Sequence, residues 1–189
     1  MASTPDSTPS DLAHFLRIPW CAKYLNEPLV HVWAPPPSRI LKPTGEDTLW
    51  STTLNTRETF SAFIAFYNKP EQPTARVDQV RAFLTADHGL QGYPGVIHGG
   101  IVATILDEVT GLLPTLNRDR TAFPKISYMT AYLNTTYRQP VRTPATILVS
   151  ATITKSEGRK LYIKGTIQDE AGTVLAEADV LFVALKHRL

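Results

Sequence analysis

Residues 95–108, GVIHGGIVATILDE, combine a histidine, two adjacent glycines and two acids within an otherwise apolar run. If a helix begins at Gly99, its first N–H groups have no intrahelical acceptor and lie at the positive end of the helix dipole. With no side chain at Gly99 or Gly100, an anion or a polarised carbonyl oxygen could approach these N–H groups closely. The alternative is that the two glycines only permit a tight turn from loop to helix.

Asp107 is an acid within a helical segment that has almost no other polar residue on its faces. Burial of an isolated carboxylate is costly, so a buried one usually has a partner or a chemical task. Its neighbour Glu108 points about 100° away around a helix, and one of the two could simply reach solvent. An acid on a half-exposed helix face therefore remains the alternative interpretation of Asp107.

The spacing between Gly99 and Asp107 constrains how the two could act together. Eight residues of helix correspond to about 12 Å along the axis, so one carboxylate cannot easily reach a group held at its own helix N-terminus. An isologous dimer would place Asp107 of one subunit opposite Gly99 of the other, with the two helices antiparallel. His98 could orient a substrate carbonyl, or it could have only a structural role at the junction of loop and helix.

Composition restricts the class of protein. The 189 residues suit one domain with a sizeable core. A net charge of +2 without a long basic run argues against nucleic acid as a partner. The single cysteine, Cys21, favours a reducing compartment. No apolar stretch is long enough for a membrane span, and residues 1–11 do not resemble a secretory signal or a basic transit peptide.

These features predict a cytoplasmic protein without a membrane span. The end of the chain, His187-Arg188-Leu189, loosely resembles a peroxisomal signal of the Ser-Lys-Leu type but lacks its small first residue. The histidines show no spacing typical of metal ligands, so no metal is expected. They are His14, His31, His88, His98 and His187.

The pattern along the chain predicts strands, then one buried helix, then an antiparallel meander. We expect disorder over 1–10, a helical stretch over 11–24 with Asp11 as the candidate N-cap and a break or bend at Pro19, and an extended arm over 33–43. Two strands follow at 48–56 and 59–68, and 77–84 is ambiguous between helix and strand.

Helix is expected over 99–113, ended by Pro114 and apolar on nearly all faces. Strands are expected within 125–141, 145–156, 160–168 and 173–185, with hairpin turns at Gly158 and Gly172. The domain boundaries follow as an extension over 1–45 and a core domain over 46–189.

With these elements in place, His98-Gly99-Gly100, six further residues and then Asp107 resemble the motif of hot-dog-fold acyl-CoA thioesterases of the phenylacetic-acid-degradation (PaaI-like) type. The lead-in GLQGYPGVIHGG is most similar to the branch that contains the thioesterase superfamily member proteins. The resemblance covers roughly residues 47–185. It implies an α+β hot-dog fold, an antiparallel sheet wrapped around one long central helix. It also implies hydrolysis of acyl-CoA or acyl-phosphopantetheine thioesters in lipid metabolism, no cofactor, and a homodimer or dimer of dimers.

The resemblance also assigns roles to residues. The Gly99 N–H would polarise the thioester carbonyl, with His98 positioning that side of the site and Gly100 contacting substrate. Asp107 would be the general base for water or the nucleophile, and Thr130 would assist it from the strand after the helix. One departure is Gly92, where some members of the family have an amide side chain.

Substrate contacts can be proposed from chemistry. The phosphates of coenzyme A call for cations, and the candidates are Arg138, Arg142, Arg159 and Lys160, although cations in turns are commonly just solvated. An acyl chain needs an apolar slot, which Phe60, Phe63, Phe66 and Tyr132 could line unless they belong to the core.

Three hypotheses remain open at this stage. The leading one is an acyl-CoA thioesterase. The second is an enzyme that acts on polyketide or fatty acyl chains bound to a carrier protein. The third is a non-catalytic module that binds acyl-CoA or lipid. The Pro-rich extension is expected to cover sheet surface and not to gate the site.

Overall fold

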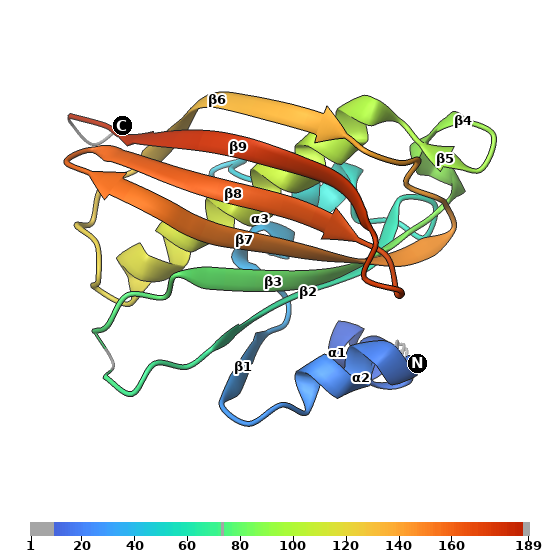
Figure 1. The fold of residues 1–189 in the computed structure, drawn as a ribbon, viewed down its shortest axis with the longest axis horizontal. Coiled ribbons are helices and arrows are strands. Elements are labelled where there is room, and N and C mark those ends of the chain that lie inside the picture. Colours follow the sequence, from blue (N-terminus) through green and yellow to red (C-terminus); the bar gives the residue numbers. More distant parts are fainter. Residues whose placement is uncertain (1–9, 73, 187–189) are drawn as a thin grey trace, which may run out of the picture.

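The computed structural model describes residues 10–72 and 74–186. The predicted disorder before Ser10 and the C-terminal tripeptide at 187–189 lie outside these residues. A seven-stranded antiparallel sheet, in the order β1-β2-β3-β7-β8-β9-β6, curls around one long helix, α3 (Figure 1). The sheet strands are β1 (Val30–Trp33), β2 (Phe60–Asn68), β3 (Gln79–Ala86), β6 (Tyr128–Tyr137), β7 (Ala145–Glu157), β8 (Lys160–Gln168) and β9 (Val174–Ala184). The predicted α+β architecture with a central helix is confirmed.

The predicted strands hold with two differences. The segment around Leu49–Thr53 forms a short helical turn rather than a strand, because β1 already pairs with the edge of β2 that a preceding strand would need. In addition, β6 does not begin the meander. It pairs with β9 at the far edge, so β7, β8 and β9 alone form the consecutive hairpins. The turns of those hairpins contain Gly158 and Gly172 at positive φ, 56° and 80°, as expected.

Helix α3 (Gly99–Asp119) continues past the predicted end at Pro114. Proline lacks an N–H and normally disrupts a helix interior, but here the helix is held against the inner face of the sheet and Pro114 is itself buried. By length and composition alone α3 could cross a bilayer. Half of that window is buried inside the protein.

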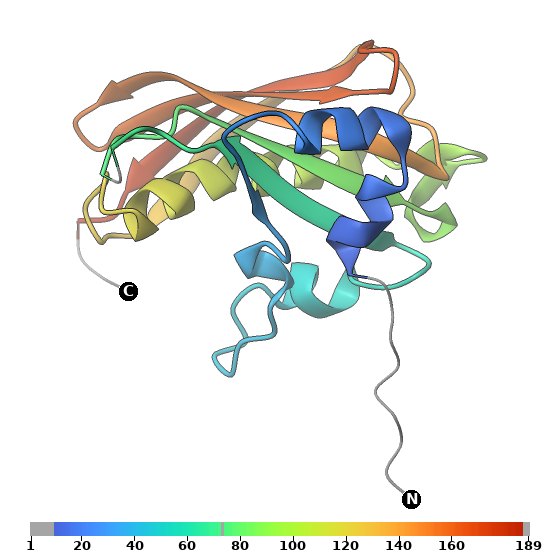
Figure 2. The same ribbon diagram turned by 90° about the horizontal axis from the view of Figure 1, so that it is seen from below.

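The core has two layers because β2 is buried on both faces. Side chains alternate along a strand, so Phe63 faces α3 while Phe66 faces α1 (Asp11–Leu16) and α2 (Pro19–Leu25). Figure 2 shows these two short helices on the face of β2 and β3 that points away from α3. Phe60, Phe63 and Phe66 are fully buried core residues, which is the alternative that the sequence left open for them.

The N-terminal segment is joined tightly to the sheet. The break between the two helices falls just before Pro19, as predicted, and Pro19 begins α2. Ser10, not Asp11, caps α1, and the Asp11 carboxylate accepts a hydrogen bond from the Phe63 N–H at 3.0 Å. We call residues 34–55 the arm. It passes around the β1 edge to the side of the sheet where α3 lies (Figure 2).

A buried asparagine joins the end of α3 to the segment before β3. The Asn117 side chain accepts from the Val77 N–H at 2.8 Å and donates to the Val77 and Leu113 carbonyls, both at 2.9 Å. We expect Asn117→Leu, which keeps the volume but removes these bonds, to lower the free energy of unfolding by about 2–3 kcal/mol, because two backbone groups stay buried without partners. Urea unfolding beside the exposed control Asn134→Leu would measure this, and equal stabilities would contradict it.

Candidate functional site

The N-terminus of α3 has one free N–H group. His98 is the N-cap, and its Nδ1 accepts a hydrogen bond from the Gly100 N–H at 3.0 Å. Among the described residues the Gly99 N–H has no acceptor, while the Gly99 carbonyl accepts from the Tyr137 hydroxyl at 2.9 Å. A ligand at Gly99 would therefore meet a free donor, whereas one at Gly100 would first have to displace His98. The roles of His98 and Gly100 in substrate binding stay predictions.

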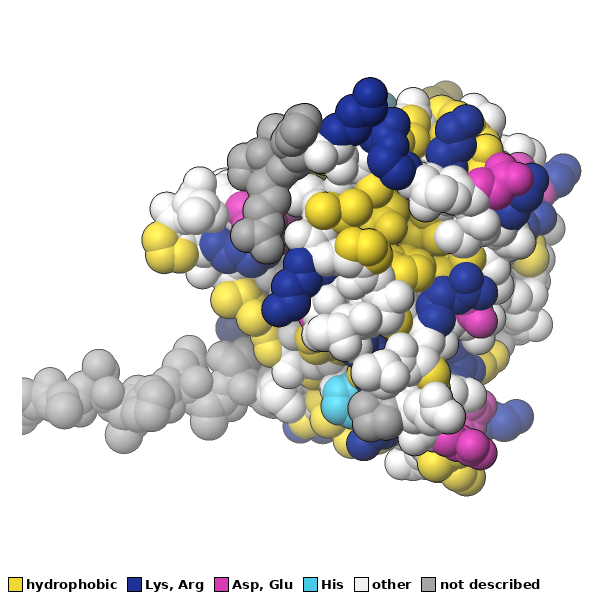
Figure 3. Space-filling view, turned by 90° about the vertical axis from the view of Figure 1, so that its left-hand side faces the viewer, with side chains coloured by type: hydrophobic (Ala, Val, Ile, Leu, Met, Phe, Trp, Pro, Cys, Tyr) yellow, Lys and Arg dark blue, Asp and Glu magenta, His cyan; other side chains and the backbone are white. Residues whose placement is uncertain are grey.

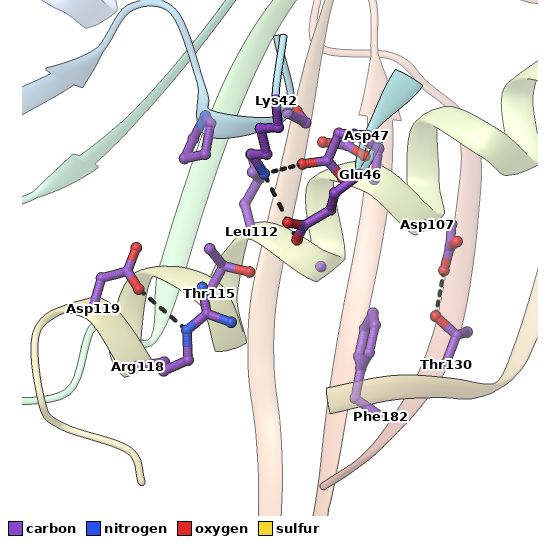
Figure 4. A pocket seen from close by; sticks show the side chains of 14 residues that line it. Lys42, Glu46, Asp47, Asp107, Leu112, Thr115, Arg118, Asp119, Thr130 and Phe182 are labelled. Carbon is purple, nitrogen blue, oxygen red and sulfur yellow. Dashed lines mark hydrogen bonds and ion pairs between the residues drawn. The ribbon is translucent and has the colours of Figure 1, made fainter. Parts of the chain in front are cut away.

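Asp107 and Thr130 come together as the resemblance implied. The Thr130 hydroxyl donates to Asp107 Oδ1 at 2.9 Å, from β6 across to α3 (Figure 4). Asp107 is half-buried and Thr130 exposed on the edge strand, so the carboxylate is held in place and remains reachable. The sequence left two alternatives for Asp107, an isolated buried acid and a freely solvated one. The structure shows neither, since Asp107 is half-buried and hydrogen-bonded.

Gly99 at the start of α3 and Asp107 near its middle line different cavities. Asp107 and Thr130 line a cavity of about 430 Å³, whereas Gly99 and Tyr137 line one of about 350 Å³ near the start of the helix. Helical rise separates Gly99 from Asp107 by about 12 Å. Within one chain the carboxylate and the free N–H therefore do not face one site.

The Asp107 cavity lies between α3, the arm and the ends of β6 and β9 (Figure 4). From Asp107 it follows one face of α3 as far as Arg118. Its lining residues are Pro37, Ser38, Lys42, Glu46, Asp47, Asp107, Glu108, Gly111, Leu112, Thr115, Arg118, Asp119, Thr130 and Phe182. The helices α1 and α2 cover the outer face of the sheet. The arm, by contrast, forms a wall of the cavity that contains Asp107, so the prediction that the Pro-rich segment only covers sheet surface is wrong.

Glu108 is the strongly perturbed acid of this cavity. Burial raises its pKa to about 7, and the charges of Asp47 and Asp107 act in the same direction, while Ser38 and Lys42 oppose them. A half-buried carboxyl with this pKa is partly protonated at neutral pH, so it can donate as well as accept a hydrogen bond. The sequence did not indicate that Glu108, rather than Asp107, has the perturbed pKa, because the surroundings of Glu108 come from the arm, which is distant along the chain.

The raised pKa of Glu108 predicts a pH-dependent stability. Its ordinary pKa is 4.5, so the folded state favours the protonated form and loses stability as the pH rises from about 4.5 through about 7. Glu108→Gln, neutral throughout, should be more stable than the wild type by about 3 kcal/mol at pH 8, and the difference should vanish at pH 4. Thermal unfolding across this range tests it, with exposed Glu58→Gln as control. A difference that does not change with pH would exclude this origin.

The predicted phosphate contacts are divided between two ends of the sheet. Arg138, near Gly99, is paired with Glu177, which also binds Lys164 at 3.0 Å. Arg159 donates a hydrogen bond to the Ala184 carbonyl at 2.9 Å. Lys160 pairs with Val183 of β9, whereas Tyr137, beside Arg138, pairs with Ala176, seven residues earlier on the same strand. That separation is about 23 Å, so one chain does not bring Arg138 together with Arg159 and Lys160.

Cations do gather at one end of the molecule. Figure 3 views the end where α3 finishes and the β7–β8 turn lies, and it shows an apolar patch bordered by Lys and Arg side chains. Contact of Arg159, Lys160 or Arg142 with coenzyme A phosphates stays a prediction. Tyr132 is exposed on β6 and lines neither cavity.

Two further observations concern the chemistry available. No group of three His, Cys, Asp or Glu side chains that could hold a metal occurs in the described part of the chain. A Cβ on Gly92 would lie 2.8 Å from His98 atoms, so the amide that some relatives have at this position could not fit without moving the cap.

A sheet that curls around one long helix, with a carboxylate near the middle of that helix and a free N–H at its start, defines the hot-dog class of proteins. The model of the thioesterase superfamily matches residues 94–176. Over these residues the chain is similar to the thioesterase superfamily.

Relatives of the chain include the acyl-coenzyme A thioesterase THEM4 of Mus musculus, which is 39% identical over 124 residues, covering 65% of this chain and 48% of that protein. The chain spans about half the length of the THEM4 relatives that it matches. Verlamelin biosynthesis protein B of a Lecanicillium species is 26% identical over 164 residues, 71% of each chain.

Solved structures agree on the fold. A thioesterase superfamily protein aligns with a TM-score of 0.51 at 27% identity, covering 65% of this chain and 53% of that one. A hypothetical thioesterase from Streptococcus pneumoniae aligns with a TM-score of 0.55 at 14% identity, covering 70% and 95%.

Proposed function

We propose that the protein hydrolyses acyl-CoA thioesters to a free acid and coenzyme A. The observation that carries the proposal is the Asp107 carboxylate, held by the Thr130 hydroxyl at 2.9 Å in the wall of a cavity. Relatives named as acyl-coenzyme A thioesterases support the substrate class.

Thioester hydrolysis needs an activated water and a donor for the developing oxyanion. Asp107 accepts a proton from the water as it attacks the thioester carbon. The Gly99 N–H, at the positive end of α3, stabilises the negative charge on the carbonyl oxygen in the tetrahedral intermediate. Collapse of the intermediate breaks the carbon–sulfur bond, and the thiolate of coenzyme A leaves with the proton returned from Asp107.

This scheme requires two subunits, because one chain holds its base and its oxyanion donor about 12 Å apart. We propose an isologous dimer in which the free edges of two β6 strands pair. In the described part of the chain, β6 has a neighbour only on the β9 side and exposes Met129, Tyr132 and Tyr137. A long unpaired edge of this kind is a template for pairing with another strand. The two α3 helices would then lie antiparallel, with Asp107 facing Gly99 of the partner subunit.

A second candidate is hydrolysis of an acyl chain carried on the phosphopantetheine of a carrier protein. The relative named as a verlamelin biosynthesis protein, which aligns over 71% of both chains, favours a biosynthetic role of this kind. The site and the chemistry would be the same, and only the carrier of the thioester would differ.

Thiol release from a panel of acyl-CoA esters, beside the same acyl groups on a carrier protein, tests both candidates. Turnover of acyl-CoA at the higher kcat/KM supports the first proposal, and turnover on the carrier protein alone supports the second. Binding of acyl-CoA without thiol release from either donor would contradict both and leave a binding module.

A further inference from the structure

The cavity that contains Asp107 continues into a second one of about 290 Å³, which reaches residues 126–129 at the start of β6. The two cavities share part of their lining: Glu46, Asp47, Gly111, Thr115, Arg118 and Phe182. Together they form one groove, which begins at Asp107 and follows α3 toward its C-terminal end. We call this space the groove.

The groove lies on the face of α3 that the core leaves free. Gly111, Thr115 and Arg118 follow Asp107 at intervals of four, four and three residues, so these positions share one face of the helix. The opposite face is packed on the sheet, where Leu113 is fully buried. A guest that starts at Asp107 therefore meets helix positions one turn apart along its length.

The wall of the groove that faces α3 comes from the arm, and the arm is fixed in place. The Arg39 guanidinium donates to the Leu54 carbonyl at 3.1 Å and to the Phe60 carbonyl at 3.0 Å. Lys42 binds the Asp47 carboxylate and so closes the turn that lies over the helix (Figure 4). The wall is thus preformed, as specific binding pockets usually are.

The other surfaces of the groove include apolar side chains. Phe182 lines both cavities from β9, while Leu112 and Pro114 contribute from α3. Met129 lines the second cavity and is 44% exposed, and a methionine side chain adapts well to an apolar guest. These surfaces suit the methylene groups of an acyl chain whose thioester lies at Asp107.

Gly111 is the position where the two cavities meet on α3, one helical turn beyond Asp107. Glycine is unfavourable in a helix interior, and packing does not require it here, because a Cβ would lie 3.8 Å from the Phe182 ring, an ordinary contact. Gly165 differs, since a Cβ there would lie 3.0 Å from the Thr110 side chain. The space beside Gly111 therefore belongs to the groove and is not filled by the core.

We propose, on the basis of the proposed function, that the groove between α3 and the arm binds the acyl chain and that Gly111 sets how far this chain extends from the thioester. Gly111 lies about 6 Å from Asp107 along the helix axis. A short acyl group ends before this position, whereas a medium-length chain passes over it. The arm, outside the region that matches the superfamily, thereby becomes a determinant of substrate choice.

The test compares kcat/KM for butanoyl-CoA and octanoyl-CoA. In the wild type, octanoyl-CoA should be favoured about tenfold or more, because each buried methylene contributes up to about fourfold. Gly111→Leu, a good helix former that fills the path, should lower kcat/KM for octanoyl-CoA about tenfold and change that for butanoyl-CoA less than about twofold. Gly111→Ala, with only one added methyl group, should keep most of the preference.

Thr115→Phe is a second, independent variant, one turn further along the groove and about 12 Å from Asp107. It should lower kcat/KM for dodecanoyl-CoA and leave octanoyl-CoA nearly unchanged. Ala171→Leu is the matched control, since Ala171 is exposed in the β8–β9 turn and lines neither cavity. It should change none of these ratios.

Equal kcat/KM for butanoyl-CoA and octanoyl-CoA in the wild type would overturn the inference. So would equal losses on both esters in Gly111→Leu, which a purely structural effect of the substitution would give, or an unchanged chain-length profile in Thr115→Phe. If the wild type hydrolyses no ester, the proposed function fails, and the dissociation constants of the same esters, measured by calorimetry, still decide whether the groove binds the chain.

Discussion

Asp107→Asn is expected to lower kcat for thioester hydrolysis about a hundredfold or more, the scale of losing a general base. The amide can still accept the hydrogen bond from Thr130, which the wild-type carboxylate receives at 2.9 Å, so the variant should fold normally. What it cannot do is take a proton from water. The effect should therefore fall on kcat and leave the affinity for acyl-CoA nearly unchanged.

Thiol release at saturating acyl-CoA measures this, with calorimetric binding of the same ester as the second readout. Asp179→Asn, an exposed acid on β9, is the control for a change of charge. If Asp107→Asn kept kcat within a few fold of the wild type, Asp107 would not be the base, and the proposed mechanism would be wrong.

Much of this site could be predicted because its parts are local. The helix that begins at Gly99, the hairpins at Gly158 and Gly172, and the pairing of Asp107 with Thr130 each follow from short stretches of sequence or from the family motif. Periodicity and turn chemistry act over a few residues, so these features do not depend on distant parts of the chain.

The features that the sequence did not indicate depend on contacts between distant segments. The strand expected around Leu49 became a helical turn because β1 takes the edge of β2, and Pro114 is tolerated because the sheet holds the helix around it. The pKa of Glu108 depends on Ser38 and Asp47, which lie far away along the chain. No local sequence pattern predicts which face of α3 the arm covers.

The proposed two-subunit site predicts that the Gly99 N–H is as necessary as Asp107. Gly99→Pro removes this donor with little other change, because proline suits the first position of a helix and the preceding residue, His98, already has the extended ψ of 135° that proline requires. Loss of one oxyanion donor should lower kcat about a hundredfold or more. Gly99→Ala keeps the N–H, and its Cβ would lie 3.5 Å from the Tyr137 ring, an ordinary contact. It should therefore retain far more activity than Gly99→Pro.

Mixed dimers then reveal how the two groups combine. In a dimer of one Asp107→Asn chain and one Gly99→Pro chain, one site has both changes and the other has neither, if Asp107 acts with Gly99 of the partner subunit. Two nearly inactive proteins should therefore give mixed dimers, isolated through two different tags after co-expression, with about half of the wild-type activity per dimer. If base and donor acted within one chain, both sites of the mixed dimer would be defective and no activity would return. A dimer of two differently tagged Asp107→Asn chains is the control, and failure to isolate any mixed dimer would contradict the pairing of β6 edges itself.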